Sequence, residues 1–225
     1  MRHPYHPVAA IGAATSVVAG IFTPAAAADS AVPLGGGAGI TVNGTPCTLT
    51  TIGHDRSGAL VGFTAGHCGG PGADVVAEGA NNGTVGSVTT VGDGLDYAVI
   101  KFDPAKVSPT ASFAGFPVTG IGSDPDWHQH VCMNGAANGL ICGGVASMPG
   151  PGPRGGMSHA LFQPGDDGAP ITTDGRLIGV AFGGLNTPGD LQGLAPSNFT
   201  DFTKFSAIVN DVNAKGGPGA GFTPI

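Results

Sequence analysis

Charged residues are scarce in this chain of 225 residues, and basic residues are the scarcest of them. Only 10% of the residues are charged, with 8 Lys and Arg against 15 Asp and Glu, so the formal net charge is -7. The basic residues form no cluster along the sequence. Because a nucleic-acid-binding surface must neutralise phosphates with Lys and Arg, we expect no nucleic-acid partner.

Long apolar segments are also missing after residue 28, so nothing there predicts a membrane span. The first 28 residues contain Arg2, an apolar stretch from Val8 to Phe22, and alanines at 25–28. This order is typical of a secretory signal peptide with its cleavage site. A membrane anchor is the alternative, but glycines interrupt the stretch and Pro24 ends it. We therefore expect removal of residues 1–28, secretion, and no membrane contact afterwards.

Glycine and proline are abundant, with 42 and 19 residues, which raises the question of disorder. The hydrophobic share of 41% is large enough to bury a core, and this argues against disorder for most of the chain. Each glycine inside a helix costs about 1 kcal/mol relative to alanine, so an all-helical architecture is excluded. The composition predicts short strands and tight turns, in one large or two small β domains.

Short runs of β-branched and aromatic residues predict strands on both sides of a proline-containing crossover at 104–117. The predicted strands are 40–42, 48–52, 60–65, 85–91, 97–102, 131–133, 140–146, 160–162, 169–172 and 177–182. Asp174 and Gly175 are a two-residue hairpin signal between the last two. Residues 29–38, with Pro33 and glycines at 35–37, indicate a flexible lead-in.

One helix is predicted near the C-terminus. Apolar residues at 202, 205, 208, 209 and 212 recur at spacings of three and four, which is typical of an amphipathic helix. Thr200 is the predicted N-cap, and Gly216 with Gly217 ends the helix. We expect the apolar stripe to pack on the strands rather than to bind a partner.

The chain has four cysteines, an even number that indicates two disulfides in an exported protein. Pairing Cys47 with Cys68 and Cys132 with Cys142 closes two short loops, and each bond is expected to contribute about 3 kcal/mol. The sequence has no CxxC pair and its histidines lack ligand spacing, so we expect no metal and no cofactor.

Three segments carry the residues for chemistry. His67 lies in GFTAGHCGG (62–70), at the end of an apolar run and directly before a cysteine. Asp96 opens DYAVIKF (96–102), where an acid at the head of a buried strand needs a hydrogen-bond partner. The third segment is the glycine-rich turn GDDGAP (165–170). This order of His, Asp and a Gly-Asp-X-Gly turn matches the chain order of a chymotrypsin-type triad.

These segments resemble the TA[AG]HC, D[IL]A[LV] and GDSGGP motifs of chymotrypsin-like serine peptidases, in particular of the bacterial streptogrisin and alpha-lytic branch. VCMNGAANGLICGG (131–144) is similar to that branch's VCRSGxTTGxxCG hairpin, and GITVNGTPCTLTTIG (39–53) to its opening strands. The resemblance implies an all-β fold of two antiparallel six-stranded β barrels, with the site in the cleft between them. The implied division is an N-terminal barrel at 39–115, a C-terminal barrel with a terminal helix at 116–215, and a tail at 216–225.

The resemblance also implies a role for each site residue. His67 matches the general base, and Asp96 the carboxylate that orients its ring. The backbone N–H groups of Gly165 and Asp167 match the oxyanion hole. Gly183–Gly184 matches the segment along which an extended peptide substrate pairs. The same two disulfides are implied.

The nucleophile position departs from the family, because it holds Asp167 where the family has serine. A carboxylate beside His67 has no proton to give, attacks amides poorly, and would form a high-energy acid anhydride. We expect instead an ion pair in which His67 stays protonated between Asp96 and Asp167. Such an imidazolium cannot act as a base near neutral pH.

Further departures surround this position. Phe182 replaces the serine that hydrogen-bonds the buried acid, and Met133 replaces an arginine that pairs with Asp166. Because an unpaired buried carboxylate is costly, we expect Asp166 to find another donor, to turn outward, or to titrate high. Arg154 is a candidate donor. Leu161 stands where many relatives have a cysteine beside the specificity pocket, so no side-chain preference is predicted.

The leading hypothesis is a secreted, monomeric, catalytically inactive homologue of trypsin-like serine peptidases that binds a peptide or protein in its cleft. The alternative is an active endopeptidase or esterase with a non-standard nucleophile, for which Ser158 is the candidate nearby in sequence. A third hypothesis is a metal site formed by His67, Asp96, Asp166 and Asp167, although their spacing does not favour one.

Overall fold

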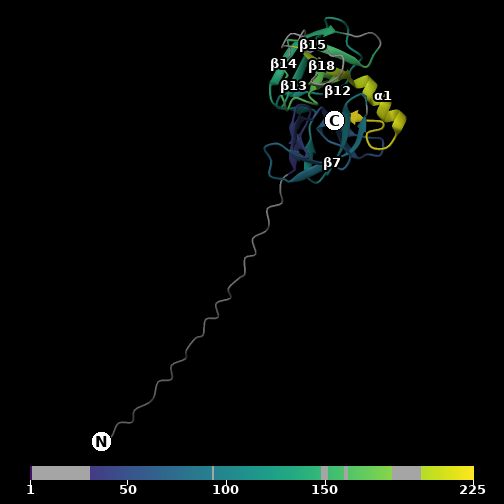
Figure 1. Ribbon diagram of the computed structural model, residues 1–225. Coiled ribbons are helices and arrows are strands. Elements are labelled where there is room, and N and C mark those ends of the chain that lie inside the picture. The colour runs from purple at the N-terminus through teal and green to yellow at the C-terminus, as the bar shows by residue number, and fades with distance from the viewer. Residues whose placement is uncertain (2–30, 93, 148–151, 160–161, 184–198) are drawn as a thin grey trace.

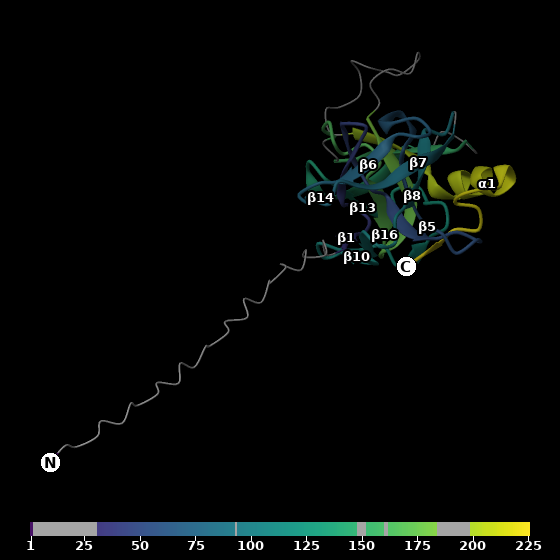
Figure 2. The ribbon, with the colours of Figure 1, turned by 90° about the horizontal axis from the view of Figure 1, so that it is seen from below.

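The computed structural model describes Met1 and residues 31–92, 94–147, 152–159, 162–183 and 199–225 (Figure 1). Strands dominate these residues and form two large curved sheets and two short strand pairs, with one α-helix beside them (Figure 2). This is the all-β, two-barrel architecture that the sequence resemblance implies. No helix among the described residues has the length and apolar character to cross a membrane. The predicted signal peptide, apart from Met1, lies outside the described residues, as do Leu161 and Gly184.

The N-terminal sheet has eight strands in the order β19-β4-β5-β8-β7-β6-β2-β3. These strands are β2 (Gly39–Val42), β3 (Thr45–Thr48), β4 (Thr51–His54), β5 (Leu60–Ala65), β6 (Asp74–Ala77), β7 (Thr84–Gly92), β8 (Tyr97–Phe102) and β19 (Thr223–Pro224). Only Leu49 and Thr50 connect β3, at one edge, with β4, which lies beside the other edge. This short connection brings the edges together, so the sheet curls into a barrel.

The C-terminal sheet has seven strands in the order β12-β17-β16-β13-β14-β15-β18. Because β17 also pairs with β18, six of these strands form a closed barrel, and β12 lies outside it. The strands are β12 (Gly120–Ile121), β13 (His130–Gly135), β14 (Gly139–Ser147), β15 (Arg154–Ser158), β16 (Pro170–Thr173), β17 (Arg176–Phe182) and β18 (Phe199–Lys204). The predicted hairpin between β16 and β17 is confirmed, with positive φ of 49° at Asp174 and 73° at Gly175. The predicted strand at 160–162 is not confirmed, because Phe162 lies outside any strand and residues 160–161 are not described.

Residues 31–38 do not form the flexible lead-in that their glycines indicated. Four short strands extend the fold beyond the two large sheets: β1 (Val32–Leu34), β9 (Val107–Pro109), β10 (Ser112–Phe113) and β11 (Phe116–Pro117). β1 pairs in parallel with β9. A Cβ at Gly36 would lie 2.6 Å from Val118 Cγ2, and a Cβ at Gly37 would lie 2.0 Å from Asn134 Nδ2. These glycines therefore permit close packing, and the prediction of flexibility is wrong for this segment.

The helix α1 (Phe205–Lys215) ends at Gly216 as predicted but begins after the predicted N-cap. Thr200 and Phe202 belong instead to β18, which pairs with both β15 and β17. The pairing that closes the barrel overrides the helical spacing of these residues. The helix still buries the rest of the predicted stripe on its inner face, at Phe205, Ile208 and Val212.

One cluster of buried apolar side chains joins the two barrels and the helix. Phe63 of β5 lies at its centre, with ring centroids 5.2 Å from Phe205 of α1 and 4.9 Å from Phe222. After Phe222 the chain pairs with β4 as β19. The residues predicted as a tail at 216–225 therefore complete the N-terminal sheet and the core between the barrels.

Both predicted disulfides are present. Cys47–Cys68 joins β3 to the 3-10 turn η1 (Gly66–Cys68), and its two residues are only 1% and 2% exposed. Cys132–Cys142 links two residues that lie directly opposite each other on β13 and β14. One bond is thus in the core, and the other is a rung of a hairpin.

Replacing Phe222 with alanine is expected to lower the free energy of unfolding by about 3–5 kcal/mol. The reason is that its side chain is 6% exposed and packs on the rings of Phe63 and Phe205. Ile225→Ala is the matched control, because Ile225 is 39% exposed and its loss should change stability by less than about 0.5 kcal/mol. Urea denaturation followed by circular dichroism measures both. Equal losses would contradict a structural role for the C-terminal strand.

Candidate active site

The glycine-rich turn at 165–168 precedes a strand of the C-terminal barrel but is held by the N-terminal barrel. The Thr48 N–H donates to the Asp167 carbonyl at 2.8 Å, and the Thr48 hydroxyl donates to the Gly165 carbonyl at 2.7 Å. The Thr50 hydroxyl donates to the Gly168 carbonyl at 2.6 Å. A Cβ at Gly168, whose φ is +90°, would lie 2.4 Å from the Thr48 carbonyl, so the turn requires glycine there. The side chain at 167 is thereby placed relative to the other barrel.

His67 and Asp96 come together because β5 pairs with β8. His67 follows β5 on η1, and Asp96 directly precedes β8, whose Tyr97 pairs with Ala65. The His67 N–H donates to Asp96 Oδ1 at 2.9 Å, and His67 Nδ1 lies 2.8 Å from Asp96 Oδ2. A Cβ at Gly66 would lie 3.0 Å from Asp96 Oδ1, so a small residue precedes the histidine. Asp96 therefore fixes both the backbone and the ring of His67.

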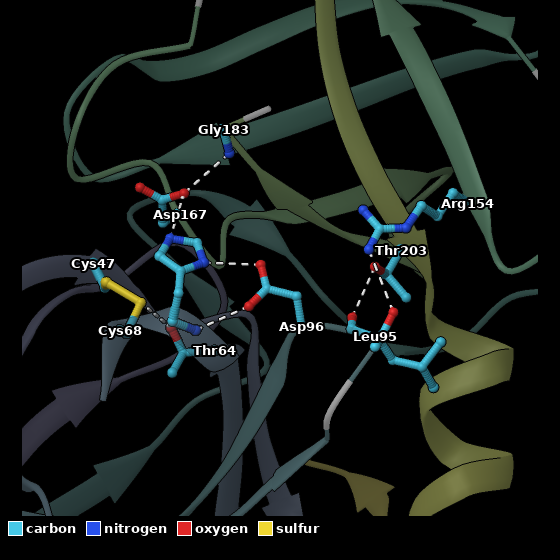
Figure 3. Close-up of polar contacts among 11 residues, drawn as sticks. Cys47, Thr64, Cys68, Leu95, Asp96, Arg154, Asp167, Gly183 and Thr203 are labelled. Atoms are coloured by element: carbon cyan, nitrogen blue, oxygen red, sulfur yellow. Dashed lines mark hydrogen bonds and ion pairs between the residues drawn. A yellow bond between two sulfur atoms is a disulfide. The ribbon is translucent and has the colours of Figure 1, made fainter. Parts of the chain in front are cut away.

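Asp167 binds the other side of the same imidazole. Its Oδ1 lies 2.9 Å from His67 Nε2 and accepts the Gly183 N–H at 3.0 Å. In Figure 3 the dashed lines run from Asp96 through the imidazole to Asp167 and on to Gly183. The structure thus brings together the three predicted triad positions and Gly183. The carboxylate spans the gap between the histidine and the chain after β17.

This arrangement raises the pKa of His67 from 6.5 to about 10, chiefly through its hydrogen bond to Asp167 and then through that to Asp96. Burial opposes the shift but does not cancel it. Burial also acts to raise the pKa of Asp96, yet the hydrogen bond and charge of His67 outweigh it and hold that pKa below its usual range. The imidazole is therefore a cation at neutral pH, as the sequence predicted.

Asp166 is fully buried and has found other donors, which is one of the outcomes that the sequence allowed. Its Oδ1 accepts the N–H groups of Ala137 and Asn138 at 3.0 and 3.1 Å. Its Oδ2 accepts the Gln163 N–H at 3.0 Å and the Asn138 side-chain amide at 2.6 Å. Four N–H groups thus replace the arginine that Met133 displaced. Asn138 and Gln163 were not singled out as donors from the sequence, because the resemblance gives Asn138 no role within the 131–144 segment and Gln163 lies in no quoted motif.

Arg154 does not pair with Asp166. Its guanidinium lies 4.6 Å from the centroid of the Phe182 ring and donates to the Gly94 carbonyl at 3.3 Å. The arginine and the triad histidine line a pocket of about 310 Å³ together with Gly66, Val91, Gly92, Gly94 and Asp96. Phe182 is 6% exposed and offers Asp96 no hydroxyl donor, as its identity predicted.

The remaining candidate residues make other contacts. Among the described residues, the Ser158 hydroxyl donates to the Gly144 carbonyl at 3.1 Å and lies 3.1 Å from His159 Nδ1. The proposed metal set is not assembled, because the oxygens of Asp166 are held by the N–H groups described above. Gly165 lies on the docked turn with φ +104°. The assignment of the Gly165 and Asp167 N–H groups to an oxyanion hole stays a prediction.

No protein-family model and no curated protein matches this chain. Solved structures match it in fold. A protease of Nocardiopsis (NAPase) is 23% identical, with a TM-score of 0.65 over 81% of this chain and 97% of that one. Protease A of Thermobifida fusca is 22% identical, with a TM-score of 0.64 over 81% and 97%. A homologue of alpha-lytic protease is 25% identical, with a TM-score of 0.62 over 85% and 99%. The structural neighbours are thus bacterial chymotrypsin-like serine proteases.

The raised pKa of His67 predicts a pH dependence of stability. Because the folded pKa lies above the unfolded value of 6.5, the ion pair stabilises fully below that pH. The contribution is lost as the pH rises from 6.5 towards about 10. Since the His67 side chain is 46% exposed, solvent weakens the effect. Nuclear magnetic resonance titration of the imidazole should show protonation persisting well above neutral pH.

Asp167→Asn is expected to lower the pKa of His67, because it removes the largest cause of the shift. Its stability should then fall less between pH 6.5 and 10 than that of the unsubstituted protein. Asp174→Asn, in an exposed hairpin turn where asparagine accepts the positive φ, is the matched control and should leave the titration unchanged. An imidazole that titrates near its ordinary value in the unsubstituted protein would contradict the ion pair.

Proposed function

We propose that the chain is a secreted, catalytically inactive homologue of trypsin-like serine peptidases, with a cleft that binds a peptide or protein without cleaving it. The observation that carries the proposal is the contact of 2.9 Å between His67 Nε2 and Asp167 Oδ1. In a working triad this nitrogen accepts the nucleophile's proton. Here the raised pKa of His67 keeps the imidazole protonated near neutral pH, and a carboxylate occupies the place of the hydroxyl.

Two steps of acyl transfer fail in this geometry. General-base catalysis needs a neutral imidazole near the working pH, whereas the pKa of His67 is raised to about 10. Nucleophilic attack by Asp167 would replace an amide by an anhydride, which is less stable than the ester formed by serine. Asp167 also accepts the Gly183 N–H, so its oxygen is committed to a second contact. The missing nucleophile and the protonated base therefore each block one step of acyl transfer.

The rest of the cleft supports binding. The 165–168 turn is docked on Thr48 and Thr50, and the pocket beside His67 remains open with a volume of about 310 Å³. The fold is that of peptidases, whose clefts hold substrates as extended chains by backbone hydrogen bonds. A ligand that enters along the chain after β17 would meet the side chain of Asp167 rather than a nucleophile.

Secretion is supported by two observations. Both disulfides are formed, and all four cysteines are used, which is typical of oxidising compartments. The N-terminal 28 residues, with Arg2, an apolar stretch and alanines, supply the sequence signal for export.

The absence of catalysis is tested with a serine-directed fluorophosphonate and a panel of peptide esters. The unsubstituted protein should be neither labelled nor active, whereas Asp167→Ser should become labelled and hydrolyse esters at least about a hundredfold faster than Asp167→Ala. Asp167→Ala is the matched control, because it removes the carboxylate without adding a hydroxyl. Covalent labelling of the unsubstituted protein near His67 would sink the proposal.

Peptide binding needs its own measurement. An array of extended peptides probed with the unsubstituted protein should show retention without cleavage, read by mass spectrometry of the recovered peptides. Gly183→Val is the variant that should abolish retention, because a Cβ there would lie 2.6 Å from the Phe162 ring and would disturb the cleft wall. Asp174→Asn, in an exposed turn, serves again as the control. Retention that is equal in Gly183→Val would exclude the cleft as the binding surface.

A further inference from the structure

The outer face of the β13–β14 hairpin carries a histidine and two cysteines. Side chains alternate along β13, so Val131 and Met133, both 0% exposed, point into the barrel, while His130 and Cys132 point outward. The strand register places Cys142 of β14 directly opposite Cys132. His130 and Cys142 are exposed, and Cys132 is half-buried.

These three side chains lie close enough to share a ligand. One imidazole nitrogen of His130 and the sulfur atoms of Cys132 and Cys142 all lie within 4.8 Å of one another. The residue opposite His130 is Gly144, and a Cβ built there would meet no atom closer than 3.8 Å. No side chain from the facing strand therefore covers the imidazole. The cluster is open to solvent on this side.

Backbone pairing holds the hairpin together in addition to its disulfide. β13 and β14 pair at every position from His130↔Gly144 to Gly135↔Gly139, and β13 also pairs with β16. β14 pairs with β15, so both strands are inside the closed barrel. The disulfide spans a sequence separation of only 10, a short loop whose closure restricts the unfolded chain least. The backbone ladder should hold the two cysteines opposite each other after the bond is broken.

The second disulfide provides the contrast. Cys47 and Cys68 are 1% and 2% exposed and lie in the hydrophobic core. Thiol–disulfide exchange requires an attacking thiolate to reach a sulfur atom, so the buried bond should react slowly and the bond at Cys142 quickly. Exposed disulfides of this kind are the labile ones in proteins.

We infer that Cys132–Cys142 is selectively reducible and that His130, Cys132 and Cys142 then form a site for a thiophilic metal ion such as Zn²⁺. Zinc binds thiolates at about 2.3 Å and imidazole at about 2.0–2.1 Å, which separates tetrahedral ligands by roughly 3.5–3.8 Å. Two opposite side chains on paired strands can reach this separation once the sulfur–sulfur bond is gone. Three protein ligands leave the fourth position to water.

The reductant is a dithiol. Its thiolate attacks the Sγ of Cys142, the disulfide breaks, and Cys132 leaves as a thiolate that takes up a proton from solvent. The second thiol of the reductant then attacks the mixed disulfide, releases Cys142 and closes a cyclic disulfide. Two electrons pass from the reductant to the protein. Metal binding afterwards releases one proton from each cysteine thiol to solvent.

The test uses the secreted protein treated with dithiothreitol under native conditions, followed by removal of the reductant without oxygen. Thiol counting with a chromogenic disulfide reagent should give the two thiols of Cys132 and Cys142, and the other two only in denaturant. Titration with Co²⁺, a spectroscopic substitute for Zn²⁺, should then give thiolate-to-metal charge-transfer and tetrahedral bands. The untreated protein should give neither band.

His130→Ala should weaken Co²⁺ binding by more than about tenfold, because even the loss of a residue that only hydrogen-bonds a metal ligand lowers metal affinity by roughly that factor. His159→Ala is the matched control, because His159 bonds Ser158 instead and should leave the affinity unchanged. The double variant Cys132→Ser/Cys142→Ser should fold and bind no metal. Unfolding of the native protein on reduction, equal reduction of both disulfides, or reduced protein that stays folded without the bands would each overturn the inference.

Discussion

The hydrogen bonds from Thr48 and Thr50 to the turn at 165–168 are the constraint on which the site depends. They join residues 117 and 118 positions apart in the chain and cross from one barrel to the other. The Thr48 carbonyl also accepts the hydroxyl of Thr64 on β5, the strand that leads directly into His67. Both halves of the site therefore rest on the same short segment. Asp167 and His67 keep a fixed separation although they lie on different barrels.

Within that fixed separation, the side chain at position 167 decides the chemistry. A hydroxyl there would have a proton that a neutral His67 could remove, whereas the carboxylate of Asp167 has only charge to offer. Two carboxylates then hold a proton on the imidazole, and the pKa of His67 rises to about 10. The imidazole that would transfer a proton in a peptidase instead keeps its proton here at neutral pH. The contact with Gly183 orients the carboxylate oxygen that does so.

The sequence predicted the motif-bearing parts of the site well and failed where glycines permit close packing between distant segments. The contact of His67 with Asp96 and both disulfides followed from recognisable motifs and cysteine spacing, whereas the donors that meet Asp166 did not. The spacing predicts helix from Phe202 onward, although Phe202 lies in β18, because the strand's partners are distant in the chain. The Phe202 ring lies against Gly155 and Gly179, where a Cβ would be 2.5 Å from it. Such close packing between strands leaves no periodic pattern in the sequence. For the same reason, the glycines of 35–37 indicated flexibility where they serve close packing.

Asp166 and Asp167 are adjacent residues whose negative charges are compensated in different ways. Four N–H groups surround the buried Asp166, a solution that is local to the C-terminal barrel. Asp167 is instead met by a cation from the N-terminal barrel, and Asp96 binds the other side of that cation. Without the proton on His67, two carboxylates would face an imidazole that could donate to only one of them. His67, Asp96 and Asp167 therefore form an ionic contact between the barrels, which gives the histidine and Asp96 a structural role.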